Sequence, residues 1–202
     1  IPDESARIPV ERYVNARKAE WPKADFVVGN PPFIGTKRIR SVLGDGYVDA
    51  LRAAWTEVPD SVDFVMYWWQ RGAELVREGG ARSFGFITTN SIRQTYNRKV
   101  LERNLAHGSH PLTITFAIPD HPWVDSADGA AVRIAMTVGG NANVPARLSE
   151  VRRETEASDG EVAVELATRG GAIQSDLSVG ANVVSARILR ANERICWQGC
   201  KL

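Results

Sequence analysis

The residues best suited to chemistry in this sequence form the tetrapeptide Asn30-Pro31-Pro32-Phe33, which follows directly on an apolar run. The two prolines fix φ at successive positions, remove two backbone donors and keep Asn30 out of the helical region. The result is a stiff loop that presents an amide, a carbonyl and an aromatic ring. These groups suit alkyl transfer to an exocyclic amine, because Asn30 and the Pro31 carbonyl can each accept one amino hydrogen while Phe33 stacks on the ring.

The element that must position this loop is the run Phe26-Val27-Val28, which is apolar and partly β-branched and predicts a buried strand. Gly29 then permits a sharp exit from the strand. Open α/β sheets bind their ligands at the carboxyl ends of strands, so the loop lies where a site is expected. A proline-rich turn that only caps a core strand is the alternative interpretation.

The elements expected downstream alternate between helix and strand. They are an amphipathic helix over 47–56, an aromatic-rich helix over 62–77, a buried strand over 81–88, a helix over 96–106, and strands over 112–118 and 131–138. We expect the last two strands to form a hairpin. The order of strand, loop, helix and strand is that of an α/β fold.

With these elements around it, Asn30-Pro31-Pro32-Phe33 resembles the catalytic motif of S-adenosylmethionine-dependent amino-methyltransferases, especially the N6-adenine DNA methyltransferases. Over about residues 24–139 the chain is similar to the methyltransferase core of single-polypeptide Type II restriction-modification enzymes. The resemblance implies the C-terminal half of a Rossmann-like class I methyltransferase sheet, ending in an antiparallel hairpin. It also implies S-adenosylmethionine as methyl donor and adenine N6 of double-stranded DNA as acceptor, with the base flipped out.

The resemblance also implies a place for the cofactor. In the family, the helix after the motif sets an aromatic ring against the cofactor's adenine, and Trp68, with Tyr67 and Phe64 as neighbours, matches that position. Core packing is the alternative for each ring. The sequence lacks the glycine-rich loop that holds most of the cofactor in the family, and Ile1 in place of Met suggests an excerpt of a longer chain. We therefore expect this chain alone to be inactive or nearly so.

Contacts with DNA must come from local features, because a net charge of +1 gives no general attraction for nucleic acid. Lys37, Arg38 and Arg40 follow the motif closely and are candidates for phosphate contacts. A solvated helix face is the alternative for them. Trp123, in the loop expected between the last two strands, is a candidate for packing on a flipped base, or else a plug beneath that loop.

The remaining features bear on domains and compartment. We expect a partial methyltransferase catalytic domain over 1–140 and a β-rich extension over 141–202 that leads into a target-recognition domain. Cys196 and Cys200 lack the spacing and partners of zinc ligands, and we expect no metal site. We see no signal peptide and no apolar run of membrane-spanning length, so we expect a cytoplasmic protein.

Two other functions stay open. Methyltransferases of RNA or of protein glutamine use nearly the same loop, although they typically carry Tyr in place of Phe33 and lack a recognition domain. A non-catalytic DNA-binding module is the second, because the glycine-rich cofactor loop is missing from the sequence.

Overall fold

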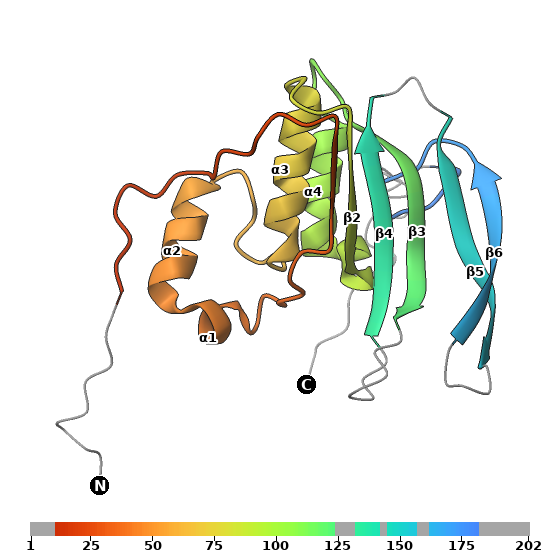
Figure 1. Cartoon of the computed structure of the whole chain (residues 1–202), viewed down its shortest axis with the longest axis horizontal. Helices are drawn as coiled ribbons and strands as arrows, with labels where there is room; N and C mark the ends of the chain where they lie inside the picture. Colours follow the sequence, from red (N-terminus) through yellow and green to blue (C-terminus); the bar gives the residue numbers. More distant parts are fainter. Residues whose placement is uncertain (1–10, 124–131, 142–144, 157–161, 182–202) are drawn as a thin grey trace, which may run out of the picture.

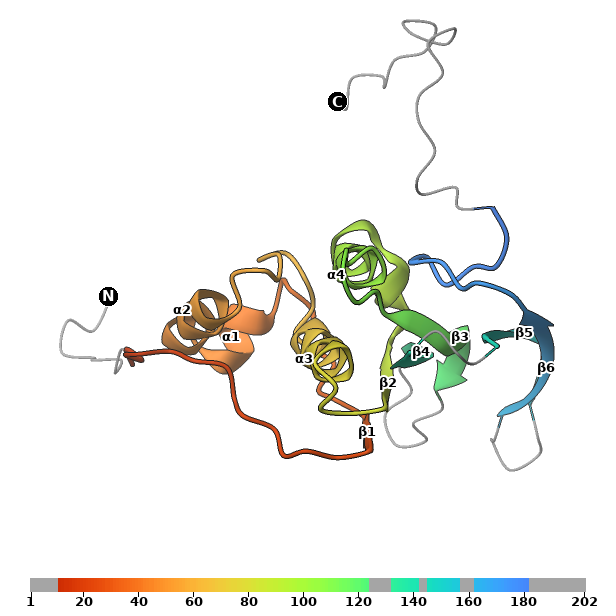
Figure 2. The same ribbon diagram turned by 90° about the horizontal axis from the view of Figure 1, so that it is seen from above.

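The strand before the tetrapeptide is β1 (Phe26–Gly29), and it lies at the edge of a six-stranded sheet with the order β1-β2-β4-β3-β5-β6. Figure 1 shows strands β2 to β6, and Figure 2 also labels β1. The computed structural model describes residues 11–123, 132–141, 145–156 and 162–181. The other strands are β2 (Ser83–Thr89), β3 (Thr113–Trp123), β4 (Val132–Gly140), β5 (Arg147–Glu156) and β6 (Val162–Gly170). The helices are α1 (Ile39–Leu43), α2 (Asp45–Ala54), α3 (Val65–Arg77) and α4 (Thr95–Leu105), with a 3-10 turn η1 over Asn90–Arg93.

The sheet is mixed, and its pairing confirms the expected α/β fold. β1 and β2 are parallel, while β4 lies antiparallel between β2 and β3. The two strands expected to form a hairpin are therefore β3 and β4. The expected β-rich extension consists of the antiparallel pair β5 and β6, which joins the same sheet where β5 runs parallel to β3. The domain boundary at 140/141 stays a prediction.

Helices α3 and α4 lie on one face of the sheet (Figure 2). The apolar positions of α3 recur every three or four residues and pack on the buried side chains of β2. Gly72 permits this close approach, because a Cβ there would lie 2.8 Å from Cγ of Phe84. Trp69 stands edge-on to Phe84, with 5.2 Å between ring centroids, and its Nε1 donates to Thr137 Oγ1 on β4 at 3.1 Å. These contacts fix α3 against the middle of the sheet.

The sequence prediction that the first strand is buried is wrong. Phe26 and Val28 are 64% and 83% exposed, and only Val27 and Gly29 point toward the helices. The reason is that β1 has β2 as its one neighbour within the described residues, and α3 covers one face alone. Apolar composition marks a strand, but its burial depends on what lies on both of its faces.

Several predicted boundaries also shift by one or more residues, and two of these shifts bear on the site. The helix α3 begins at Val65 rather than at residue 62, because the amide of Phe64 donates to the Ile34 carbonyl outside the helix. Strand β3 continues to Trp123, so this residue lies at the end of a strand and not in a loop. Residues 124–131, the rest of the predicted loop, and Cys196 and Cys200 lie outside the described residues. None of the described helices is long and apolar enough to cross a membrane.

Candidate active site

The tetrapeptide leaves the sheet at the carboxyl end of β1. Asn30 is exposed, Pro31 is buried and Phe33 is half-buried. The Ile34 amide donates to the Pro32 carbonyl at 3.1 Å, which tightens the turn around Phe33. Within the described residues, neither the Asn30 side chain nor the Pro31 carbonyl has a hydrogen-bond partner. Both acceptors are therefore unengaged within the described part of the chain.

The chain that follows the tetrapeptide is tied to the start of α3. The Phe64 amide donates to the Ile34 carbonyl at 2.9 Å, and the Thr36 amide donates to Asp63 Oδ1 at 2.9 Å. The loop is thus held on its far side by two residues that immediately precede a helix packed on the sheet. This arrangement restrains the loop beyond the stiffness that its prolines supply.

Three segments distant in sequence meet at the same edge of the sheet. Strand β1 runs parallel to β2, and both β2 and β3 run antiparallel to β4. The carboxyl ends of β1, β2 and β3 therefore lie at the same end of the sheet, which we call its carboxyl edge. The side-chain nitrogen Nδ2 of Asn90, just after β2, donates to Asp120 Oδ1 on β3 at 3.2 Å. Trp123 lies further along β3 and is half-buried. Asn30 and Trp123 thus lie at the same end of the sheet, with β2 and β4 between their strands, and the role of Trp123 stays a prediction.

A cluster of charged side chains, which the sequence did not indicate, joins three strands at this end of the sheet. Arg133 on β4 donates through Nε to Asp120 at 2.6 Å and through Nη2 to Glu154 on β5 at 2.8 Å. These hydrogen bonds, the one to Glu154 most of all, raise the pKa of Arg133 above its ordinary value. Three strands are joined in this way. No local sequence signal could reveal the cluster, because its members come together only through strand pairing.

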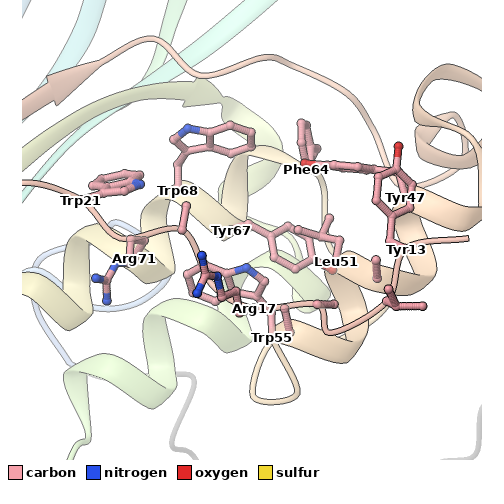
Figure 3. A pocket seen from close by; sticks show the side chains of 15 residues that line it. Tyr13, Arg17, Trp21, Tyr47, Leu51, Trp55, Phe64, Tyr67, Trp68 and Arg71 are labelled. Atoms are coloured by element: carbon pink, nitrogen blue, oxygen red, sulfur yellow. The ribbon is translucent and has the colours of Figure 1, made fainter.

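An aromatic cavity of about 330 Å³ opens between the segment 13–21, α2 and α3 (Figure 3). The three residues predicted to bind the cofactor, Phe64, Tyr67 and Trp68, all line it. Trp68 stands edge-on to Phe64 with 4.5 Å between ring centroids. The rest of the lining is Tyr13, Val14, Ala16, Arg17, Ala19, Trp21, Tyr47, Ala50, Leu51, Ala54, Trp55 and Arg71.

The cavity wall contributed by the N-terminal segment is held by a partly buried ion pair. Lys18 Nζ lies 2.8 Å from Glu74 Oε1 on α3, also bonds Glu57, and stands 4.4 Å from the ring centroid of Trp55. Burial alone would raise the pKa of Glu74, but hydrogen bonds from Lys18 and Gln70 outweigh it and leave that pKa below its usual value. Burial likewise opposes the charge of Lys18, yet its two carboxylate partners raise its pKa.

The three cations after the tetrapeptide have different surroundings. Lys37 and Arg38 are exposed in the turn before α1 and have no carboxylate partner within the described part of the chain. Arg40, in α1, bonds Asp45 and Asp49, each at 2.8 Å, and these hydrogen bonds raise its pKa. The charge of Arg40 is thus engaged within the chain, whereas the other two are available to a partner.

Known proteins resemble this chain over most of its length. The family model described as "MmeI, DNA-methyltransferase domain" matches residues 2–149. The solved structure of the Type IIL restriction-modification enzyme MmeI in complex with DNA is 25% identical, with a TM-score of 0.56. The match covers 78% of this chain and 20% of that one, so the chain spans about one fifth of the length of MmeI.

A second solved structure is more distant. It is a modification subunit of a putative type I restriction enzyme from Vibrio vulnificus, 10% identical with a TM-score of 0.48, and the match covers 73% of this chain and 34% of that one. No curated protein sequence matches. The family match over residues 2–149 confirms the predicted resemblance to the methyltransferase core of restriction-modification enzymes, and the chain belongs to the family of MmeI DNA-methyltransferase domains.

Proposed function

We propose that the chain is the part of a restriction-modification enzyme that holds the target amine while a methyl group passes from S-adenosylmethionine to adenine N6 in double-stranded DNA. The observation that carries the proposal is a pair of acceptors at the carboxyl end of β1, the Asn30 amide oxygen and the Pro31 carbonyl, which have no partner among the described residues. Two acceptors match the two hydrogens of an exocyclic amino group. The adjacent Phe33 ring adds a stacking surface for the base.

The roles of the residues follow from the chemistry of an aromatic amine. Its lone pair is delocalised into the ring, and acceptance of both hydrogens by Asn30 and Pro31 favours the localised lone pair that can attack. A base must first leave the duplex, which costs a few kcal/mol. Stacking on Phe33 contributes about 1–3 kcal/mol in return. No general base is needed before the attack, since the proton leaves readily once the nitrogen carries the methyl group.

S-adenosylmethionine supplies an electrophilic methyl group on a sulfonium sulfur. The aromatic cavity is a fitting place for its adenine, because the rings of Phe64, Tyr67 and Trp68 offer faces and edges to a planar heterocycle. The cavity adjoins the tetrapeptide loop through Phe64, whose amide binds the Ile34 carbonyl. Orientation of the two substrates is the main contribution that these residues make to the rate.

We assign the contacts with DNA from the charge of each side chain and from its position relative to the tetrapeptide. Lys37 and Arg38 carry unengaged charges just beyond the tetrapeptide and suit contacts with phosphates. Arg40 contributes less, because Asp45 and Asp49 already neutralise it. Trp123 shares the edge of the sheet with Asn30 and suits packing against a displaced base.

The test is Asn30→Ala in the full-length protein, assayed with labelled S-adenosylmethionine on DNA, RNA and protein substrates. We expect methyl transfer to DNA to be lost while DNA affinity stays within about threefold, because Asn30 acts on the amine and not on phosphates. Asn141→Ala is the matched control, since Asn141 is exposed just beyond the end of β4, at the opposite edge of the sheet. Full activity of Asn30→Ala, or a methylated product other than N6-methyladenine, would contradict the proposal.

A further inference from the structure

Asp63 gathers hydrogen bonds from three separate segments around the tetrapeptide loop. Its Oδ1 accepts from the Thr36 amide at 2.9 Å. Its Oδ2 accepts from the Ser91 hydroxyl and from the Asn97 side-chain amide, both at 2.7 Å. Thr36 follows the tetrapeptide, Ser91 follows β2, and Asn97 lies in α4. A carboxylate can accept on both oxygens, as three donors require.

The orientation of each group in this cluster is determined by its other partners. Ser91 has one hydroxyl hydrogen and gives it to Asp63, so the Thr89 hydroxyl must be the donor in its contact with Ser91 Oγ. The Asn97 side-chain oxygen accepts from the Asp63 amide at 2.9 Å, which orients the Asn97 nitrogen toward the carboxylate. The Asn97 nitrogen also donates to the Ser91 carbonyl at 3.1 Å. The hydrogen bonds therefore determine both the position of the Ser91 and Asn97 side chains and the direction in which each one donates.

Stabilisation of α3 does not account for this arrangement. Asp63 lies just before the helix, where a carboxylate commonly caps the first turn. The N-terminus of α3 has no side-chain cap hydrogen bond, and the Asp63 oxygens turn instead to Thr36, Ser91 and Asn97. The carboxylate thus links the loops that follow two neighbouring parallel strands, β1 and β2.

We propose that Asp63 is a positioning residue that holds the Asn30–Phe33 loop at a set distance from the Thr89–Ser91 segment and from the aromatic cavity. The next residue, Phe64, completes the link, because its amide binds the Ile34 carbonyl while its ring lines the cavity. This role rests on the methyl transfer proposed above. In that reaction Asp63 acts through Asn30 and touches neither substrate. Misplacement of a reacting group by about 1 Å can cost about 100-fold in rate.

The test compares Asp63→Asn with Asp60→Asn in the full-length protein. Asparagine keeps one oxygen for Thr36 but turns an NH₂ group toward the donors of Ser91 and Asn97. Asp60 is a matched control because its side chain is 72% exposed and its contact with Arg52 is 3.7 Å long. We expect Asp63→Asn to lower kcat about 100-fold, with KM for DNA and for S-adenosylmethionine within about threefold of wild type.

Hydrogen exchange supplies a readout that does not depend on activity. In Asp63→Asn we expect the amides of residues 33–38 to exchange about tenfold faster, with those of β2 unchanged. Asp60→Asn should match the wild type in every measurement. If Asp63→Asn does not fold, the test uses Ser91→Ala instead, because this variant removes one donor to Asp63 and keeps the carboxylate. A severalfold fall in the kcat of Ser91→Ala supports the positioning role of Asp63.

Each outcome bears on one of the two proposals. If the wild type is active and Asp63→Asn has an unimpaired kcat, the positioning role of Asp63 is overturned. The same holds for Ser91→Ala if Asp63→Asn does not fold. A wild type without methyl transfer overturns the proposed function instead. Hydrogen exchange at residues 33–38 of Asp63→Asn then tests by itself whether Asp63 holds the loop: faster exchange supports this role, and unchanged exchange overturns it.

Discussion

Lys18→Met should uncouple the N-terminal segment from α3, and the size of the effect follows from the surroundings of the ion pair. Exposed pairs contribute about 0–1 kcal/mol, whereas loss of one partner from a fully buried pair costs about 3–5 kcal/mol. The Glu74 side chain is 9% exposed and that of Lys18 is 32% exposed. Glu74 also keeps hydrogen bonds from Gln70 and Arg71 when Lys18 is removed. We therefore expect a coupling free energy of about 1–2 kcal/mol between Lys18 and Glu74.

The pH dependence of this coupling follows from the two pKa shifts. The pKa of Glu74 is lowered in the folded chain, so its contribution is present above the ordinary glutamate value of about 4.3 and is lost as pH falls through the folded value. The pKa of Lys18 is raised, so its contribution is present below about 10.4 and is lost as pH rises through the folded value. The coupling should be constant between about pH 5 and 10.

The assay is a double-mutant cycle of Lys18→Met and Glu74→Gln, measured by urea unfolding and followed by tryptophan fluorescence. Trp55, one of six tryptophans in the chain, lies beneath Lys18 and contributes to this signal. Lys23→Met is the matched control, because Lys23 is exposed on the same segment. A coupling below about 0.3 kcal/mol at pH 7, or one unchanged at pH 3, would refute the reasoning, because additive sites agree within about 0.3–0.5 kcal/mol.

Three further predictions concern packing, the cofactor and DNA. Gly139→Ala should lower stability by about 1–3 kcal/mol in thermal unfolding, because its Cβ would lie 2.4 Å from Cε1 of Phe84. Trp68→Ala should weaken binding of S-adenosylmethionine about tenfold in calorimetry, since loss of an aromatic contact of about 1.4 kcal/mol corresponds to that factor. Lys37→Gln combined with Arg38→Gln should weaken DNA binding equally for all sequences and reduce the salt slope by about 2.

Each of these has a control within the chain. Gly108→Ala should leave stability nearly unchanged, because nothing lies within 4 Å of a Cβ there. Tyr96→Ala removes an exposed ring on α4, far from the cavity lining, and should leave cofactor affinity as it was. Arg40→Gln should reduce the salt slope by less than either neighbour does, because Arg40 is already paired. Equal effects of the control and the test variant would count against the corresponding prediction.

Local sequence patterns predicted most of the elements and their order, although the short helix α1 and the 3-10 turn η1 were not predicted. The apolar run before Asn30, the glycine pair after α3 and the periodicity of α4 are properties of neighbouring residues, and each predicts its element without reference to distant ones. The tetrapeptide is informative for the same reason, since two prolines restrict their own backbone and that of the residue before them. Phe64, Tyr67 and Trp68 were predicted from the family resemblance, and all three line the aromatic cavity, whereas Arg71 on α3 lines it without having been predicted. Their binding of the cofactor stays a prediction.

Tertiary structure alone decided how β1 is buried and what holds the tetrapeptide loop in place. Phe26 and Val28 read as core residues, yet exposure depends on which strands and helices lie beside β1, and that is not encoded in the strand itself. The donors to the Asp63 carboxylate are 27, 28 and 34 residues away in sequence. Only the parallel pairing of β1 with β2 and the packing of α4 bring them together, because hydrogen bonds of this kind require contact in space and leave no periodic trace along the chain.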